Sequence, residues 1–131
     1  MLLDATTGEI LQNNAIEIMP PENISAIKPF LYVENSAYFD TVKSFLAKNL
    51  STNPVGGIEY LEYASLVFIS YHVHQDGLIN YLIVVTADGE VLIQEKLGER
   101  LKGLGLETFF ILSGCLFFVR NKRELVSYRI V

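Results

Sequence analysis

From Ile58 to the end of the chain, apolar runs alternate with tight-turn signals. Leu66–His74 is rich in β-branched and aromatic residues, Asp76-Gly77 supplies a turn, and Ile79–Thr86 returns. Gly residues suit such turns because two-residue hairpin loops need positive φ. Further segments repeat the pattern: Glu90–Leu97, Thr108–Leu112, Cys115–Arg120 and Glu124–Val131. The pattern predicts a mainly β fold built as an antiparallel meander.

One segment has helical rather than β periodicity. Phe39, Val42 and Leu46 recur at helical spacing, and Ser36 is placed as an N-cap. The sequence therefore predicts one α-helix over residues 36–50. Pro29 limits residues 25–34 to an edge strand or a loop. Residues 51–57 and Gly98–Gly105 are predicted to be loops.

Length and composition limit the function classes. A chain of 131 residues fits a single domain over residues 1–131. Its 50% hydrophobic content with only 19% charged residues predicts either a large core or apolar surface that meets a partner, and we expect self-association. The net charge of −5 argues against nucleic-acid binding. No apolar run approaches roughly 20 residues and no signal peptide is evident, so we expect no membrane contact and a cytoplasmic location.

The meander has the length of a β-propeller blade, since Ile58–Leu97 holds four predicted strands in about 40 residues. Leu3–Leu11, with Asp4-Ala5-Thr6-Thr7-Gly8, resembles the strand-turn-strand of quinoprotein-type propeller blades. That family then has a Trp that docks one blade on the next. Here the position holds Gln12 and the chain has no Trp, which argues against quinone chemistry. No cofactor is expected.

The carboxy-terminal stretch also resembles an uncharacterised bacterial family of propeller-like proteins, which supplies no activity to carry over. The segments concerned include Glu59–Glu62, Asn80–Ile83 and Thr108–Ile111. Closed propellers have about four to eight blades, and this chain holds about three at most. Three alternatives follow: an open or sandwich-like sheet, chains that associate to cover their edges, or the carboxy-terminal part of a longer protein. We expect unpaired sheet edges at both termini.

Two histidines form the strongest candidate ligand site. His72 and His74 lie two residues apart, so in a strand they share one face and could bind a divalent metal, with Asp76 just beyond. No clear third ligand is visible. A small-ligand or metal-binding domain that uses His72 and His74 is therefore the alternative function. Two histidines near the end of a strand more often face solvent or form hydrogen bonds with the sheet surface than bind a metal.

No catalytic constellation emerges from the remaining polar residues. Glu59 and Glu62 would face opposite sides of a strand, which is poor geometry for an acid/base pair. Gly103 and Gly105 precede a strand, not the helix that a dinucleotide site needs. Cys115 is expected to be buried and inert. The sequence thus predicts a non-catalytic β-rich interaction or scaffold module, with a second copy or another protein as its partner.

Overall fold

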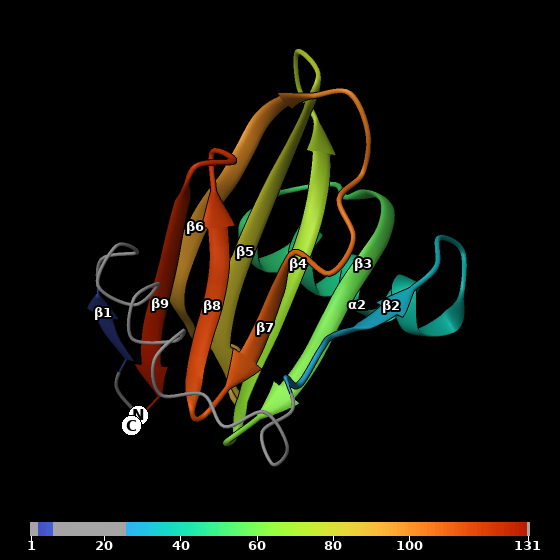
Figure 1. Cartoon of the computed structure of the whole chain (residues 1–131). Coiled ribbons are helices and arrows are strands. Elements are labelled where there is room, and N and C mark those ends of the chain that lie inside the picture. The colour runs from blue at the N-terminus through green and yellow to red at the C-terminus, as the bar shows by residue number, and fades with distance from the viewer. Residues whose placement is uncertain (1–2, 7–25, 131) are drawn as a thin grey trace. The chain divides into compact units, whose positions relative to one another are not determined.

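The computed structural model of the chain describes residues 3–6 and 26–130, which form two open antiparallel sheets and one helix (Figure 1). These residues separate into two compact units. One is built on residues 29–106, and the other on the described residues before 29 and after 106. The mainly β fold with antiparallel meanders is confirmed.

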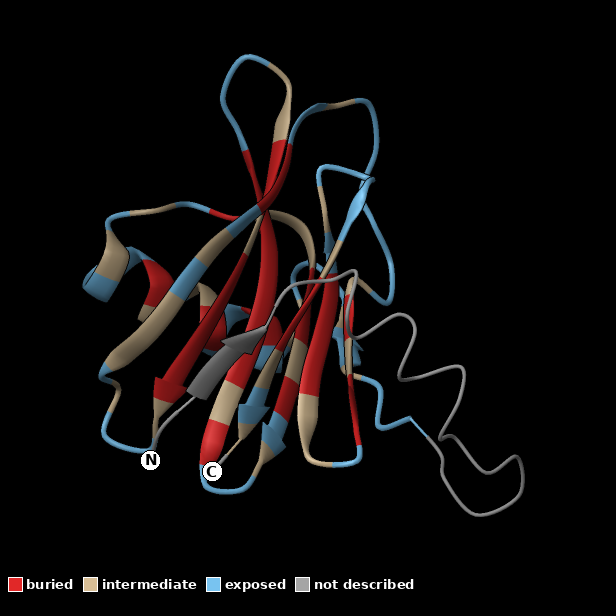
Figure 2. Ribbon diagram, turned by 60° about the vertical axis from the view of Figure 1, so that its left-hand side comes forward, coloured by how far each residue is buried: buried red, intermediate tan, exposed pale blue. Residues whose placement is uncertain are grey.

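The larger unit contains a five-stranded sheet in the order β2-β3-β4-β5-β6, in which every neighbouring pair is antiparallel. The central strands β4 and β5 are buried along most of their length (Figure 2). Chain order and sheet order agree, as a meander requires. The strands are β2 (Phe30–Tyr32), β3 (Val55–Tyr63), β4 (Leu66–His74), β5 (Leu78–Thr86) and β6 (Val91–Leu101).

Two predicted loop segments are partly strand, whereas residues 51–54 and 102–105 lie outside the strands as predicted. β3 begins at Val55 and includes Gly56 and Gly57, where the register with β4 shifts and Gly56 adopts φ +72°. β6 continues to Leu101 because the register with β5 shifts near its end, where Arg100 has φ +52°. Such bulges insert extra residues and let a strand continue past a glycine. The prediction of a loop over Gly98–Gly105 is therefore wrong for its first four residues.

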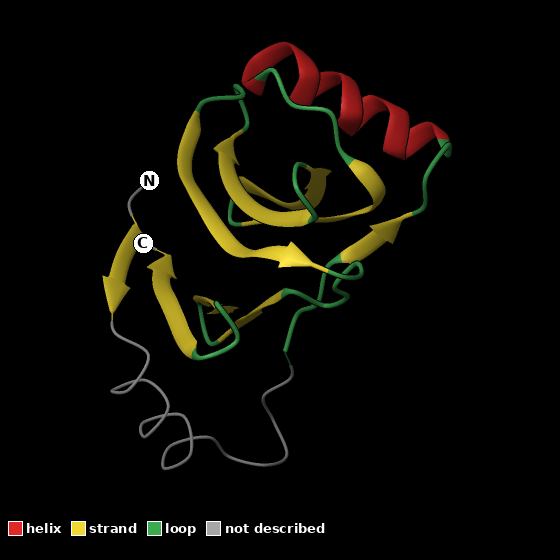
Figure 3. Ribbon diagram, turned by 90° about the horizontal axis from the view of Figure 1, so that it is seen from above, coloured by secondary structure: helices red, strands yellow, loops and turns green. Residues whose placement is uncertain are grey.

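The predicted helix is present as α2 (Ala37–Leu50). Ser36 caps it, since the Phe39 N–H donates to Ser36 Oγ at 3.3 Å. Phe39, Val42 and Leu46 are buried at the spacing that predicted the helix. They pack with odd-numbered residues of β4 and β5 into one hydrophobic cluster, so α2 lies across one face of the five-stranded sheet (Figure 3). Burying this face explains why a helix of this length is stable.

The smaller unit contains a four-stranded antiparallel sheet in the order β1-β9-β8-β7. Its strands are β1 (Leu3–Thr6), β7 (Phe109–Leu112), β8 (Cys115–Arg120) and β9 (Glu124–Ile130). Phe110 and Phe117 face each other across β7 and β8 with ring centroids 5.3 Å apart. Ile27 adds backbone bonds of 2.7 and 2.9 Å to Ile111.

The expectation of an unpaired carboxy-terminal edge is wrong. β9 pairs with β8 on one side and with β1 on the other, with Leu3 opposite Ile130. The first and last described strands therefore complete one sheet. The predicted turn at Gly8, the returning strand to Leu11 and the Gln12 position lie outside the described residues.

Hairpin turns follow the predicted chemistry at most positions. Asp76 and Gly77 have φ values of +53° and +93°, and Gly89 has +89°. Ala64 and Ser65 form an unpredicted turn between β3 and β4 at φ +52° and +65°, although neither is a glycine. Left-handed backbone costs such residues energy, so this turn is held by the strands on either side of it.

Candidate interaction surface

His72 is buried within the larger unit, with only 3% of its surface exposed. Its Nε2 accepts a hydrogen bond from the Gly105 N–H at 3.1 Å. A neutral imidazole that accepts at Nε2 carries its proton on Nδ1, and this buried Nδ1 has no hydrogen-bond partner among the described residues. Burial lowers the pKa of His72 below 6.5. The side chain therefore acts as a neutral acceptor that holds the chain at Gly105.

This geometry bears on the predicted metal site. A neutral histidine offers a metal one lone pair, and that of His72 is already occupied by the Gly105 N–H. His74 is exposed, as is Asp76. Within the described residues, no group of three or more His, Cys, Asp or Glu side chains is arranged to hold a metal ion. Metal binding by His72 and His74 stays a prediction.

His72 belongs to a set of buried polar residues on the sheet face opposite α2. Asn80 lies opposite His72 on β5, and its Nδ2 donates to Ser70 Oγ at 3.0 Å and to the Tyr71 carbonyl at 3.0 Å. Glu59 lies opposite Ser70 on β3 and is 5% exposed. The hydrogen bonds of Asn80 join neighbouring strands, so they reinforce the sheet.

The two carboxylates considered for acid/base chemistry are separated by the sheet. Glu59 is buried, whereas Glu62 is exposed. Glu62 accepts a hydrogen bond from the Tyr60 hydroxyl at 3.0 Å. Burial, together with this carboxylate, raises the pKa of Tyr60 to about 12. Tyr60 thus stays protonated at neutral pH and cannot serve as a base.

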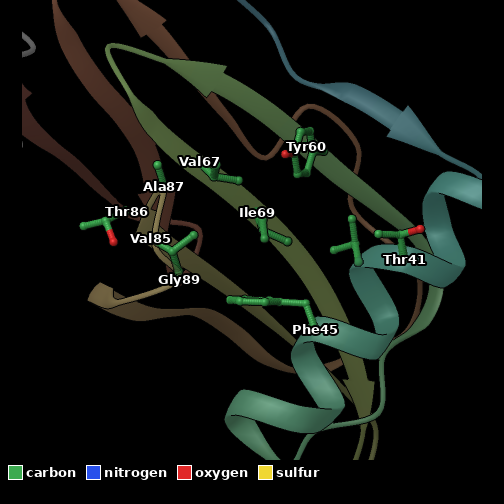
Figure 4. Close-up of a pocket in the computed structure, with 10 residues that line it drawn as sticks. Thr41, Phe45, Tyr60, Val67, Ile69, Val85, Thr86, Ala87 and Gly89 are labelled. Carbon is green, nitrogen blue, oxygen red and sulfur yellow. The ribbon is translucent and has the colours of Figure 1, made fainter.

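A groove of about 230 Å³ lies between α2 and the sheet (Figure 4). Phe45 of the helix points toward Ile69 and Val85, and the hydroxyls of Thr41 and Thr86 are near its rim. Typical ligand pockets measure about 300–1,000 Å³. None of the candidate residues His72, His74, Asp76 or Glu62 lines this groove. Its lining contains no Asp, Glu, His, Cys, Lys or Arg side chain, and Tyr60 is the titratable residue in it.

The remaining candidates have ordinary structural roles. The Gly105 amide donates to His72, and the next element in the chain is the strand β7 rather than a helix. Cys115 is half-buried at the start of β8, so the expectation of full burial is wrong.

The feature that stands out is a set of exposed apolar side chains on the edge strand β2 and in the residues that follow it. Phe30 is 69% exposed, Leu31 47% and Val33 60%, and Tyr38 at the start of α2 is 69% exposed. We call these four residues the β2 patch. β2 pairs with β3 on one side only, and it forms an outer edge of the five-stranded sheet (Figure 1). Consecutive exposed apolar residues on a sheet edge favour association with another chain.

An aromatic stack supports the β2 patch from one face. The ring of Tyr32 stacks on Tyr38 and on Tyr60, with centroid distances of 5.2 Å in both cases. On the other face, Leu31 packs so closely on Gly57 that a Cβ there would lie 2.7 Å from Leu31 Cδ1. The short strand is therefore fixed by contacts on both faces, which lowers the entropy cost of binding.

Sequence reasoning missed this patch. Pro29 indicated an edge strand or loop, but the apolar run from Phe30 to Val33 has no alternation that separates a buried face from an exposed one. A short apolar run beside a proline was the available signal.

Comparisons with protein-family models, with curated proteins and with solved structures found no match. Within the described part of the chain, no helix has the length and apolarity that crossing a membrane requires.

Proposed function

We propose that the chain is a non-catalytic, β-rich interaction module that associates with itself through the β2 patch. The observation that carries this proposal is the exposure of Phe30 and Leu31 on β2, whose outer side is unpaired among the described residues, together with the exposure of Val33 just after the strand. Leaving such a surface in water is unfavourable by about 25 cal/mol for each Å² of apolar area. A second sheet edge covers the side chains and satisfies the backbone groups at once.

Two further features support an interaction role. The candidate acid, base and metal residues are dispersed: Glu59 and His72 are buried, whereas Glu62 and His74 are exposed. The β2 patch is also pre-ordered by the stack of Tyr32 with Tyr38 and Tyr60. Pre-ordered apolar surfaces with aromatic side chains are typical of protein interfaces.

Light scattering after size separation tests the proposal over loading concentrations from about 1 μM to about 1 mM. The molar mass should rise from that of one chain toward that of two. The double variant Phe30→Ser with Leu31→Ser should remain a single chain throughout. Val119→Ser is the matched control, because Val119 is 49% exposed but lies on β8 of the smaller unit. A wild-type mass that stays at one chain over the whole range contradicts self-association.

A further inference from the structure

We infer that two copies of the chain pair β2 against β2 in antiparallel register, about a two-fold axis that passes through Leu31. The inference rests on the proposed self-association and specifies its geometry. It joins the two five-stranded sheets edge to edge into one continuous sheet. This is a self-complementary contact, in which each copy contributes the same residues.

The sequence around β2 is charge-complementary to its own reverse. It runs from Lys28 through Leu31 at the centre to Glu34. Lys28 lies two residues before β2, and Glu34 lies in the turn that follows it. Antiparallel pairing about Leu31 brings Lys28 and the partner's Glu34 to the same end of the contact, and the symmetry repeats this pair at the other end. Parallel pairing would place like charges opposite each other. Shifting the antiparallel register by two residues in either direction removes both ion pairs, so the charges select one register.

The apolar residues agree with the same register. Phe30 and Tyr32 lie opposite Tyr60 and Ile58 of β3, so both point to the sheet face that α2 covers. A two-fold axis perpendicular to the sheet keeps these faces together. Phe30 then lies beside the partner subunit's Tyr32 and extends the Tyr32–Tyr60 stack across the contact. Cross-strand aromatic pairs of this kind stabilise antiparallel sheets.

On the opposite face, Leu31 meets the partner's Leu31 at the axis. Pro29 lies opposite the partner's Val33, where the Pro29 carbonyl can accept a backbone N–H although Pro29 has none to donate. Proline at one end and Glu34 at the other limit the pairing to a few residues. The β2 patch has four residues, whereas a stable interface has about 20–30 residues on each side. The dimer is therefore reversible and depends on concentration.

Both flanking charges already have local contacts that leave them accessible. Lys28 Nζ lies 3.2 Å from Glu107 Oε1, and the Lys28 side chain is 58% exposed. The Gly56 N–H donates to Glu34 Oε2 at 3.3 Å, and that contact is exposed. An ammonium has three donors and a carboxylate has several acceptor positions, so each can add a partner across the axis.

Site-specific cross-linking tests the register. In a Cys115→Ala background, Leu31→Cys places two thiols directly opposite each other, with Cα atoms about 4.5–5.5 Å apart, within disulfide range. Mild oxidation should convert this variant rapidly into a covalent dimer. Val33→Cys is the matched control, because Val33 lies two residues further along the chain, directly after β2, and is also exposed. Its two copies would lie about 13 Å apart along the strands, so it should cross-link slowly.

Charge reversal gives an independent test. Lys28→Glu and Glu34→Lys should each weaken the dimer about tenfold, because each replaces two ion pairs by two like-charge pairs. The double variant should recover wild-type association. Glu107→Gln controls for loss of the existing Lys28 contact and should leave the dimer unchanged.

The outcomes separate this inference from the proposed function. Suppose that the wild type dimerises with rising concentration but Val33→Cys cross-links as fast as Leu31→Cys, or the double charge variant does not recover. Either result overturns the register and leaves self-association intact. A wild-type chain that stays monomeric overturns both.

Discussion

The clearest prediction of the fold concerns the buried acceptor His72, and the test is the substitution His72→Gln. The imidazole is 3% exposed, and its Nε2 holds the Gly105 N–H at 3.1 Å. Protonation would put a hydrogen on Nε2 and break that bond. It would also bury a charge on the face that holds Asn80 and Ser70. Glutamine keeps an acceptor oxygen but cannot titrate near neutral pH.

The sign of the pH dependence follows from the direction of the pKa shift. Burial lowers the pKa of His72 in the folded state below its unfolded value of 6.5. Between these two pKa values the unfolded chain binds one more proton than the folded chain. The stability that neutral His72 contributes is therefore present above pH 6.5 and is lost as the pH falls toward the folded pKa. The slope is at most about 1.4 kcal/mol per pH unit.

Urea unfolding at several pH values between 8 and 5 measures this contribution. At pH 8 we expect His72→Gln to be less stable than wild type by about 1 kcal/mol or more, because a well-packed buried ring is lost. That difference should shrink below pH 6.5, since only the wild type loses the His72 contribution. His74→Gln removes an exposed histidine and should keep the wild-type profile. A stability difference between wild type and His72→Gln that is equal at pH 8 and pH 5 refutes the reasoning.

Three further predictions concern strained turns and metal binding. Replacing Ala64-Ser65 by Asn-Gly should raise the free energy of unfolding, measured in urea, by about 1–2 kcal/mol, because Ala64 and Ser65 both have positive φ, which Asn and Gly adopt more readily. An unchanged urea midpoint would show that the turn is unstrained. Gly77→Ala should lower the free energy of unfolding by about 1–3 kcal/mol, because Gly77 has φ +93° and a Cβ there would lie 3.0 Å from Arg100 Cα. Gly103→Ala is the control, since a Cβ at Gly103 meets open space and should leave the free energy of unfolding nearly unchanged. Added zinc should leave Tm unchanged, because the His72 lone pair is occupied; a zinc-dependent rise in Tm that His72→Gln abolishes would support the metal-binding alternative.

Local features of the fold were predictable from the sequence because neighbouring residues determine them. The helix follows from the spacing of Phe39, Val42 and Leu46 and from the Ser36 cap. The hairpin at Asp76-Gly77 follows from the positive φ that this turn needs. Pairing between distant segments was not predictable, as the union of β1 with β9 shows. Hydrophobic periodicity identifies a strand but not its partner.

The candidate site was predictable only in part. The sequence singled out His72, yet nothing in the residues around it showed that Gly105, 33 positions away, would occupy its lone pair. The β2 patch was missed because exposure depends on what packs against a segment. Phe30 and Phe39 are the same residue type, but Phe30 is 69% exposed on an edge strand, whereas Phe39 is 1% exposed on α2 and packs against the sheet. The high apolar content is in keeping with the exposed apolar side chains of the β2 patch, and a partner for that patch stays a prediction.

The central claim is that β2 is the surface through which two copies associate. Hydrogen exchange of the β2 backbone amides, followed as the protein concentration rises from about 1 μM to about 1 mM, tests it most directly. An unpaired edge strand exchanges quickly, whereas a strand paired on both sides is protected. We predict that protection at Leu31 and its neighbours increases with concentration while the β7 edge stays unchanged. The claim is contradicted if the molar mass doubles while the exchange protection of the β2 amides stays the same at every concentration. That result would place the interface elsewhere.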